Sequence, residues 1–407
     1  MTELLRPVAE WELQSMVTRL AAKRSPVEIV GHGALRNTGR LSALPLALTT
    51  AAIRGITLYE PAELVMSARA GTPLFEIEQE LAARGQMLAF EPVDLGPATG
   101  SQAGALSIGG VFATNISGAR RISAGGARDH LLGVRGVNGR GEVFKSGGRV
   151  IKNVTGLDVA RALTGSWGTL SVLTEVTFKV TPLPETMTTL VYRGLPDDFA
   201  IEALTTAMGT PYEVSGAAHL PRAAAARLKT PKLKNLGDAL TLLRLENFAG
   251  SVAYRQDKLK DALKVYGDPL ILQPEDAWNL WLELRSLSVM PYSVETNLWR
   301  ISTTPSKGPE IVASLKKFMP AEAFYDWSGG LVWLEVPAAA DAAAADVRRA
   351  VAIRGGHATL IRAAPEVRAV VDVFEPMKPE IERLSRGLKT QFDPAGILNP
   401  GRMYAGF

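Results

Sequence analysis

The sequence predicts an α+β protein of two domains, because helix-like and strand-like stretches are mixed along a chain too long for one core. The chain has 407 residues, and single hydrophobic cores stop growing at about 250–300 residues. Glycine-rich stretches fill the first part and cease after Pro184, where apolar strands joined to alanine-rich helices begin. This change predicts a first domain over 1–184, a smaller α+β domain over 185–368 and a C-terminal segment over 369–407.

Elements of the first domain follow from hydrophobic spacing and from turn residues. Thr72 is expected to cap a helix with Pro73 at its first position and Gly85 just past its end. Asn138 and Gly139 mark the turn of a hairpin. The expected elements are a helix over about 8–23, strands over 27–30 and 56–59, a helix over 73–84, a strand over 87–90, hairpin strands over 131–137 and 142–144, and a long strand over 170–180.

The second domain is expected to contain two strand–helix units. These are strands over 240–245 and 330–336, each followed by a helix (256–265 and 338–353), with a returning strand over 358–362. It contains an aromatic stretch of Trp278, Trp281, Tyr292 and Trp299. Its three tryptophans are expected to lie in the core or at an interface rather than to form a substrate platform. A final helix begins at 379 and ends in a proline- and glycine-punctuated tail.

Composition excludes several classes of protein. The net charge is +4 without a basic block, which does not favour nucleic-acid binding. The absence of cysteine excludes disulfides, thiolate zinc sites, a cysteine nucleophile and ligation of an iron–sulfur cluster by this chain. The start, MTELLRPVAEWEL, lacks a signal-peptide core, and the most apolar window, 41–53, is too short to span a bilayer. We therefore expect a cytoplasmic protein without a metal site of its own.

Two stretches of small residues predict a site for a large cofactor. LSIGGVFATNISGARR covers 106–121, and KSGGRVIKNVTGLDVARALTGSWG covers 145–168. Small residues let the backbone approach a flat or charged ligand and bind it through N–H groups. A packing seam would also explain the glycines, but it explains Asn115, Ser117 and the pair Arg120-Arg121 less well.

A third glycine-rich stretch, GHGALRNTG over 31–39, follows a predicted strand and could bind a pyrophosphate. It does not fit the Rossmann fingerprint, because Arg36 stands where the third glycine belongs. A plain turn is the alternative, although Arg36 and Arg40 favour an anion. His32 in this loop is a candidate phosphate contact, and His130 is expected to be structural; His219 and His357 stand alone in the second domain.

Taken together, these segments resemble one family. GHGALRNTG, EPVDLGPATG, LSIGGVFATNISGARR, GGRVIKNVTGLD, GSWGTLSVLTEVTFKV and FDPAGILNPGRM occur in the order typical of the vanillyl-alcohol-oxidase (PCMH-type) FAD-binding domain. Within that family the chain is similar to the E subunits of bacterial glycolate oxidase (glycolate dehydrogenase). The resemblance implies an FAD domain of two α+β subdomains, with a cap domain and a C-terminal segment that returns to the FAD domain.

The resemblance also implies which residues bind FAD. Around the pyrophosphate it places Gly31, His32, Gly33, Ala34 and Gly39. Facing the isoalloxazine and ribityl it places Gly109, Gly110, Ala113, Thr114, Ser117 and Gly118. Near the adenine end it places Gly165, Gly168, Leu170, Val172 and Thr174. Asn399 would return to the ring. Relatives with covalent FAD carry a histidine where Ala34 stands here, so noncovalent FAD is expected.

In function, the resemblance implies a subunit of a complex that oxidises glycolate to glyoxylate, beside a catalytic flavoprotein subunit and an iron–sulfur subunit. The chain would be cytoplasmic, held at the inner membrane only through those partners. Related enzymes have a histidine-rich cap segment that supplies a metal and a base, and this sequence lacks one. A carboxylate anchor could be Arg120, Arg121 or Arg285, but no catalytic base is identified. A self-sufficient 2-hydroxy-acid dehydrogenase with His357 or His219 as base and a noncatalytic flavin-binding scaffold remain open.

Overall fold

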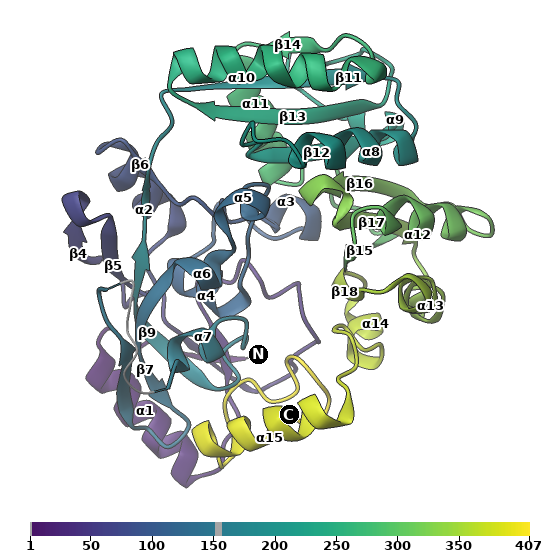
Figure 1. Ribbon diagram of the computed structural model, residues 1–407. Coiled ribbons are helices and arrows are strands. Elements are labelled where there is room, and N and C mark those ends of the chain that lie inside the picture. The colour runs from purple at the N-terminus through teal and green to yellow at the C-terminus, as the bar shows by residue number, and fades with distance from the viewer. Residues whose placement is uncertain (1, 151–156) are drawn as a thin grey trace.

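The computed structural model describes residues 2–150 and 157–407 of the chain. Within these residues the strands form four sheets, and the α+β class expected from the sequence is confirmed. Figure 1 shows the eight-stranded sheet, in green, above and to the right of the purple and blue N-terminal part, with the yellow C-terminal segment along the bottom. Residues 151–156, which belong to the second small-residue stretch, lie outside the described residues.

A five-stranded antiparallel sheet organises much of the N-terminal part. Its strands, in spatial order, are β4 (Ile56–Glu60), β5 (Val65–Arg69), β9 (Ser171–Lys179), β7 (Leu131–Asn138) and β8 (Val143–Gly147). The helices around it are α2 (Leu74–Ala82), α3 (Gly96–Thr99), α4 (Ile108–Thr114), α5 (Arg121–Ala124), α6 (Ala127–His130) and α7 (Val159–Leu163). Helices α2, α4 and α7 bury apolar residues against β5, β7 and β9 in one core.

A small parallel sheet lies beside it and receives the end of the chain. Its order is β1 (Glu3–Leu5), β3 (Leu46–Thr49) and β2 (Glu28–Val30), and helix α1 (Glu10–Ala22) packs on β7. Leu398 pairs with Val27 just before β2, and both are buried in the same core. This pairing brings the tail beside the first strands, although about 370 residues separate them in sequence. A two-stranded pairing of β6 (Gln86–Met87) with β10 (Thr181–Pro182) completes the N-terminal part.

The third large feature is an eight-stranded antiparallel sheet. Its strands, in spatial order, are β14 (Leu270–Leu272), β11 (Thr186–Arg193), β13 (Leu240–Asn247), β12 (Gly216–Leu220), β16 (Glu322–Asp326), β17 (Leu331–Pro337), β15 (Thr296–Ser302) and β18 (His357–Arg362). The helices that accompany it are α8 (Asp197–Met208), α9 (Arg222–Ala225), α10 (Ala249–Ala262), α11 (Pro274–Arg285), α12 (Lys307–Lys316), α13 (Ala344–Arg354) and α14 (Pro365–Val370).

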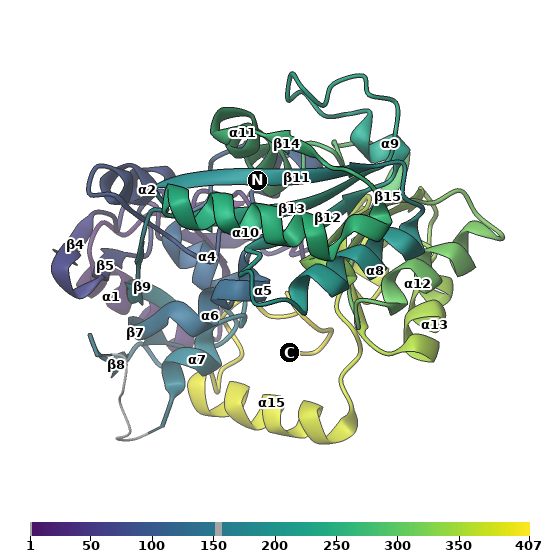
Figure 2. The same ribbon diagram turned by 45° about the horizontal axis from the view of Figure 1, so that its top comes forward.

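The two faces of this sheet are covered differently. Helices α8, α10, α12 and α13 bury their apolar residues on one face. The other face packs on α11 and on Val93, Leu95, Ala98 and Ala119 of the N-terminal part. Figure 2 shows α10 and α8 along the near side of the sheet and α11 behind it. The second face is therefore buried against the region that holds the small-residue stretches.

Most of the elements expected from sequence are present. The hairpin at Asn138 and Gly139 is confirmed as β7–β8, and the expected strand–helix units appear as β13–α10 and β17–α13 with β18 returning. The prediction that Thr72 caps α2 was wrong. Pro73 occupies the N-cap position, and Thr72 Oγ1 donates to the Arg69 carbonyl at 2.7 Å instead. The strand expected over 87–90 ends at Met87.

The tryptophans of the aromatic stretch and the C-terminal helix also match their expectations, with Trp278 partly buried against the same core as Trp281, whereas Tyr292 is exposed. Trp299 and Trp281 are buried within the cores on the two faces of the eight-stranded sheet. Helix α15 (Pro379–Phe392) is followed by an irregular tail that reaches β2. Among the described residues, no helix combines the length and the apolar character needed to cross a membrane.

Candidate functional site

A cleft lies where the small parallel sheet, α4 and β9 meet. It contains about 790 Å³ of empty space, part of which is open to solvent. Eleven of the seventeen residues that the sequence analysis placed around a cofactor line it: Gly31, His32, Gly33, Ala34, Gly109, Gly110, Ala113, Thr114, Gly168, Val172 and Asn399. Three segments far apart in the sequence therefore share one cavity with the C-terminal tail.

The first loop presents bare backbone donors to this cleft. The N–H groups of His32, Gly33 and Ala34 have no hydrogen-bond partner among the described residues. The Nε2 atom of His32 lies 2.8 Å from the Gly71 carbonyl, which holds the ring in the wall. Consecutive free N–H groups form a concavity suited to an anion.

Two further groups on the cleft wall are suited to a polar ligand. Arg402 is 6% exposed and has no carboxylate within ion-pair distance among the described residues. Burial lowers its pKa to about 10, so it remains cationic at neutral pH. Ser171 Oγ is buried on the same wall without a hydrogen-bond partner in the described part of the chain. The Arg402 guanidinium donates to the Arg40 and Leu35 carbonyls, whereas the Ser171 hydroxyl fits a ligand that supplies its missing partner.

Close contacts explain why the walls need glycine. A Cβ on Gly109 would lie 2.7 Å from the Ala70 carbonyl oxygen, so α4 could not approach β5 as it does. Gly168 has a φ of +70°, and a Cβ there would lie 2.9 Å from Asn399 Nδ2. Asn399 itself ties two walls together. Its Oδ1 accepts from Ile29 N at 2.7 Å and its Nδ2 donates to the Trp167 carbonyl at 2.7 Å.

The other six predicted cofactor residues lie outside the cleft lining. Gly39 packs against Arg402, Gly165 N donates to the Phe112 carbonyl, and Leu170 is in the core. Thr174 Oγ1 donates to Glu10, Ser117 Oγ accepts from Ala127 N, and the Gly118 carbonyl accepts from Trp327. These residues support the surrounding structure through their own contacts.

A second cavity, which we call the chamber, adjoins the cleft. It contains about 860 Å³ of empty space, part of which is open to solvent, and it shares Thr114 and Trp167 with the cleft. One side comes from α4, α5 and the loop between them, and the opposite side comes from β15, β17 and β18. The polar residues on its wall include Arg121, Arg300 and His357, and no aspartate or glutamate of the described residues lines it.

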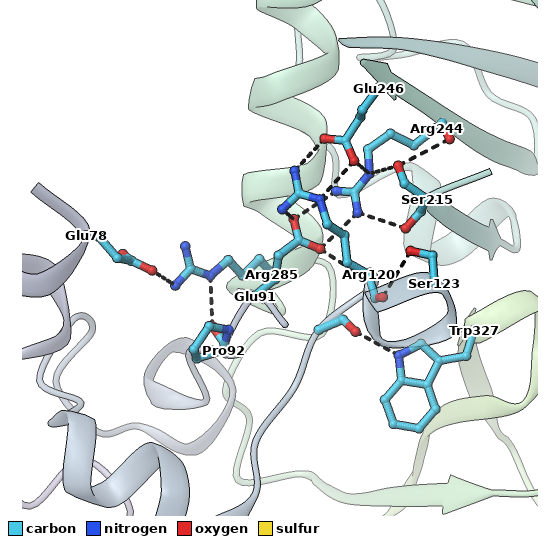
Figure 3. A network of polar contacts seen from close by, with 11 residues as sticks. Glu78, Glu91, Pro92, Arg120, Ser123, Ser215, Arg244, Glu246, Arg285 and Trp327 are labelled. Atoms are coloured by element: carbon cyan, nitrogen blue, oxygen red, sulfur yellow. Dashed lines mark hydrogen bonds and ion pairs between the residues drawn. The ribbon is translucent and has the colours of Figure 1, made fainter. Parts of the chain in front are cut away.

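Only one of the three arginines proposed as an anchor from the sequence reaches the chamber. Arg120 is buried in ion pairs with Glu91 and Glu246, as Figure 3 shows. Arg285 donates to the Pro92 carbonyl and to Glu78. Their charges are already neutralised, which leaves Arg121 on the chamber wall.

The three histidines other than His32 are held in different ways. His219 is fully buried in the eight-stranded sheet, with Nδ1 2.9 Å from Thr241 Oγ1 and Nε2 3.3 Å from Asp197. His130 Nε2 binds the Ala124 carbonyl, as expected of a structural residue. His357 alone lines the chamber, where desolvation and then the positive charge of Arg300 lower its pKa. Within the described part of the chain, His, Asp and Glu form no cluster of three or more suited to a metal.

Sequence reasoning missed several residues of these cavities. Ser107 caps α4 by accepting from Gly110 N and also lines the cleft. Trp167, with a φ of +55°, stands between the cleft and the chamber. Arg300 lies between the buried Trp299 and Ile301 on β15, and an arginine within such an apolar strand was a signal available in the sequence.

Comparisons with known proteins agree with this geometry. A profile described as "FAD binding domain" matches residues 3–147. The chain is 33% identical to glycolate oxidase subunit GlcE of Escherichia coli (strain K12), over 97% of each chain. The chain belongs to the family of FAD-binding glycolate oxidase subunits.

Two further comparisons extend this result. Glycolate oxidase subunit GlcD of Bacillus subtilis (strain 168) is 28% identical over 74% of this chain and 68% of its own length. The solved structure of p-cresol methylhydroxylase with substrate bound has the same fold, with a TM-score of 0.70 at 14% identity, covering 99% of this chain and 88% of the other. The chain is therefore an FAD-dependent oxidoreductase by family, with the fold expected from its sequence.

Proposed function

We propose that this chain is the FAD-binding subunit of a glycolate dehydrogenase (glycolate oxidase) complex that oxidises glycolate to glyoxylate. The observation that carries the proposal is the cleft, whose free N–H groups, buried Arg402 and unpartnered Ser171 Oγ suit a dinucleotide. The similarity to a glycolate oxidase subunit along 97% of both chains supports the substrate.

Within the cleft, each wall has a role in holding FAD. Gly31, His32, Gly33 and Ala34 bind the pyrophosphate through their backbone, with Arg402 nearby as a counter-charge. Gly109, Gly110, Ala113 and Thr114 bind the ring and ribityl side, and Gly168 and Val172 the adenine side. Asn399 holds the walls together. FAD is noncovalent, because Ala34 cannot form a bond to it. Gly39, Ser117, Gly118, Gly165, Leu170 and Thr174 support these walls by packing.

In such a reaction, bound FAD supplies the acceptor for the hydride from the α-carbon of the substrate. The protein must hold the substrate, exclude water and accept the proton of the hydroxyl group. The 407 residues contain no cysteine, so thiolate ligands for the next electron carrier come from a partner. We propose a catalytic flavoprotein subunit and an iron–sulfur subunit as partners, with the chain in the cytoplasm and held at the inner membrane through them.

We also propose three structural units: an FAD domain over 1–184, a cap domain over 185–368 and a C-terminal segment over 369–407 that packs back on the FAD domain. The limits are supported by the eight-stranded sheet, whose strands all fall between Thr186 and Arg362. The pairing of Leu398 with Val27 supports the return of the tail.

The visible spectrum of the purified chain tests the function. We expect a flavin band after reconstitution with FAD, and bleaching by anaerobic glycolate once the partner subunits are present. A chain that binds no FAD would overturn the proposal. If the flavin bound to this chain stays oxidised while the complex turns over glycolate, the chain is a noncatalytic scaffold.

One observation favours a second candidate, a self-sufficient 2-hydroxy-acid dehydrogenase. His357 shares the chamber with Arg121 and Arg300, and its lowered pKa leaves a neutral imidazole able to accept a proton. If the chain alone is bleached by glycolate, His357→Ala is expected to slow the bleaching about 10²- to 10⁴-fold, with added imidazole restoring part of the rate. An unchanged rate in His357→Ala would remove His357 as the base.

A further inference from the structure

The chamber is lined by two arginines that pair with no carboxylate of the described residues, Arg121 and Arg300. It shares the lining residues Thr114 and Trp167 with the cleft, so a molecule within it lies next to the end of the cleft lined by α4. Much of its wall is apolar, formed by Val93, Leu95, Ile116, Trp333, Ile361 and Phe374. Two arginines in such an apolar wall are unexpected, because burying an unpaired charge lowers the stability of the folded state.

Arg300 is the more unusual of the two arginines. It projects from the middle of β15, and no carboxylate or carbonyl of the described residues lies within hydrogen-bond or ion-pair distance of its guanidinium. Its Cζ lies 5.0 Å from the ring centre of Trp327 and 5.9 Å from that of Trp333. Burial, and then the positive charge of Arg121, lowers the pKa of Arg300 to about 10, so the group stays cationic at neutral pH.

Arg121 comes from the other side of the chamber and is equally unpaired. It begins α5, its Cζ lies 5.0 Å from the same Trp327 ring centre, and no described acid pairs with it. Its neighbour Arg120 contrasts with it, because Arg120 is paired with two glutamates. Of these two adjacent arginines, Arg120 is paired with acids, and Arg121, which faces the chamber, is not paired with any acid of the described residues.

The indole between them is held in place by the protein. Trp327 Nε1 donates to the Gly118 carbonyl at 2.9 Å, and its own N–H donates to Asp326 at 2.7 Å. Figure 3 shows the ring beside the helix that follows Arg120. Trp327 and Ser328 have φ values of +51° and +59°, a backbone strain that proteins tolerate mainly where a side chain must be presented. The ring orients both guanidiniums by cation–π contact.

We propose that the chamber binds the carboxylate of a small anionic substrate through Arg121 and Arg300, on this chain itself. Guanidinium groups bind carboxylates through charge-assisted hydrogen bonds that are among the strongest available to a protein. The identity of that anion as a 2-hydroxy acid rests on the proposed function. The assignment of substrate binding to this chain, and not to a partner subunit alone, rests on the two unpaired arginines.

Ligand titration of the FAD-loaded chain, without partner subunits, tests this proposal. Oxalate serves as an unreactive anionic probe and glycolamide as a neutral one, with binding followed by the flavin absorption band and by tryptophan fluorescence. We expect saturable binding of oxalate and none of glycolamide. Arg300→Met and Arg121→Met are each expected to weaken oxalate binding roughly 10- to 100-fold, and Arg300→Lys to weaken it less.

The matched control is Arg193→Met, which removes an exposed arginine from β11 that is paired with Asp238. It should bind oxalate as the unaltered chain does. Equal binding of oxalate by the unaltered chain and Arg300→Met, with FAD retained by both, would overturn the proposal, as would glycolamide binding as well as oxalate. Failure of this proposal can be distinguished from failure of the proposed function, because FAD binding and glycolate-dependent bleaching are measured separately from oxalate binding.

Discussion

Replacing Ala113 by phenylalanine is expected to abolish FAD binding without unfolding the protein. Ala113 lies on α4 and lines the cleft, and it is only half-buried, so its side chain has room to grow into the cavity. A phenyl ring there would occupy space needed by the cofactor, while the helix accepts phenylalanine at a cost below about 1 kcal/mol. We expect the dissociation constant for FAD to rise at least about 100-fold, which is about 2.7 kcal/mol, as measured by quenching of FAD fluorescence.

Ala253→Phe provides the control for this change. Ala253 is an exposed residue of α10, on the eight-stranded sheet and away from the cleft. It introduces the same side chain on a helix and should leave FAD affinity unchanged. If Ala113→Phe, folded by circular dichroism, bound FAD as tightly as this control, the cleft would not be the cofactor site.

Replacing Glu91 by alanine is expected to lower the free energy of unfolding by about 3–5 kcal/mol, because it leaves buried charges unpaired. The Glu91 carboxylate lies between Arg120 and Arg244, at 2.8 Å and 2.9 Å, and also accepts from Arg120 N at 2.9 Å (Figure 3). Arg244 comes from β13 of the eight-stranded sheet, while Glu91 and Arg120 belong to the N-terminal part. The pairs therefore fasten these two parts together. Denaturation in urea measures the loss.

The dependence on pH gives this prediction a second test. The two arginines lower the pKa of Glu91 to about 2, against the desolvation that acts in the opposite direction. A lowered pKa stabilises the folded state above about pH 4.5, the value in the unfolded chain, and this contribution is lost as the pH falls towards 2. The gap in stability between the unaltered chain and Glu91→Ala should therefore narrow between pH 4.5 and 2.

Glu382→Ala is the matched control, because Glu382 forms an exposed pair with Arg386 on α15. Exposed pairs of this kind contribute about 0.3–0.5 kcal/mol to stability, so the urea concentration at the midpoint of unfolding should hardly change. A loss in Glu91→Ala no larger than in this control would show that the buried network does not hold the two parts together.

The sequence was informative wherever a local pattern has one physical cause. The Asn138-Gly139 turn and the hydrophobic spacing of α1 depend on neighbouring residues, and both elements lie where they were expected. The cleft could be anticipated in the same way, because glycine at positions such as Gly109 has a direct steric reason. Thr72 misled because a threonine before a proline usually signals a cap, whereas here its hydroxyl closes a turn with Arg69.

The chamber could not be predicted because its residues meet only in the folded chain. Arg121 and Arg300 are separated by nearly half the sequence, and nothing local shows that one arginine is paired and its neighbour is not. Arg120 lies 126 residues from Glu246, and Glu91 lies 153 residues from Arg244. The choice among Arg120, Arg121 and Arg285 as an anchor thus depended on contacts with distant acids, which only the structure supplies.

The hydrogen bonds of Asn399 to Ile29 and Trp167 also determine when the cleft can be completed during synthesis of the chain. Ile29 and Asn399 are 370 residues apart, and a contact of such separation cannot form until the later residue has been made. The strands and glycines of the cleft all precede residue 180, so the ribosome completes them long before Asn399, which holds the walls together, has been made. Stable cofactor loading must therefore wait until the whole eight-stranded sheet has left the ribosome, and an early nascent chain would hold FAD poorly.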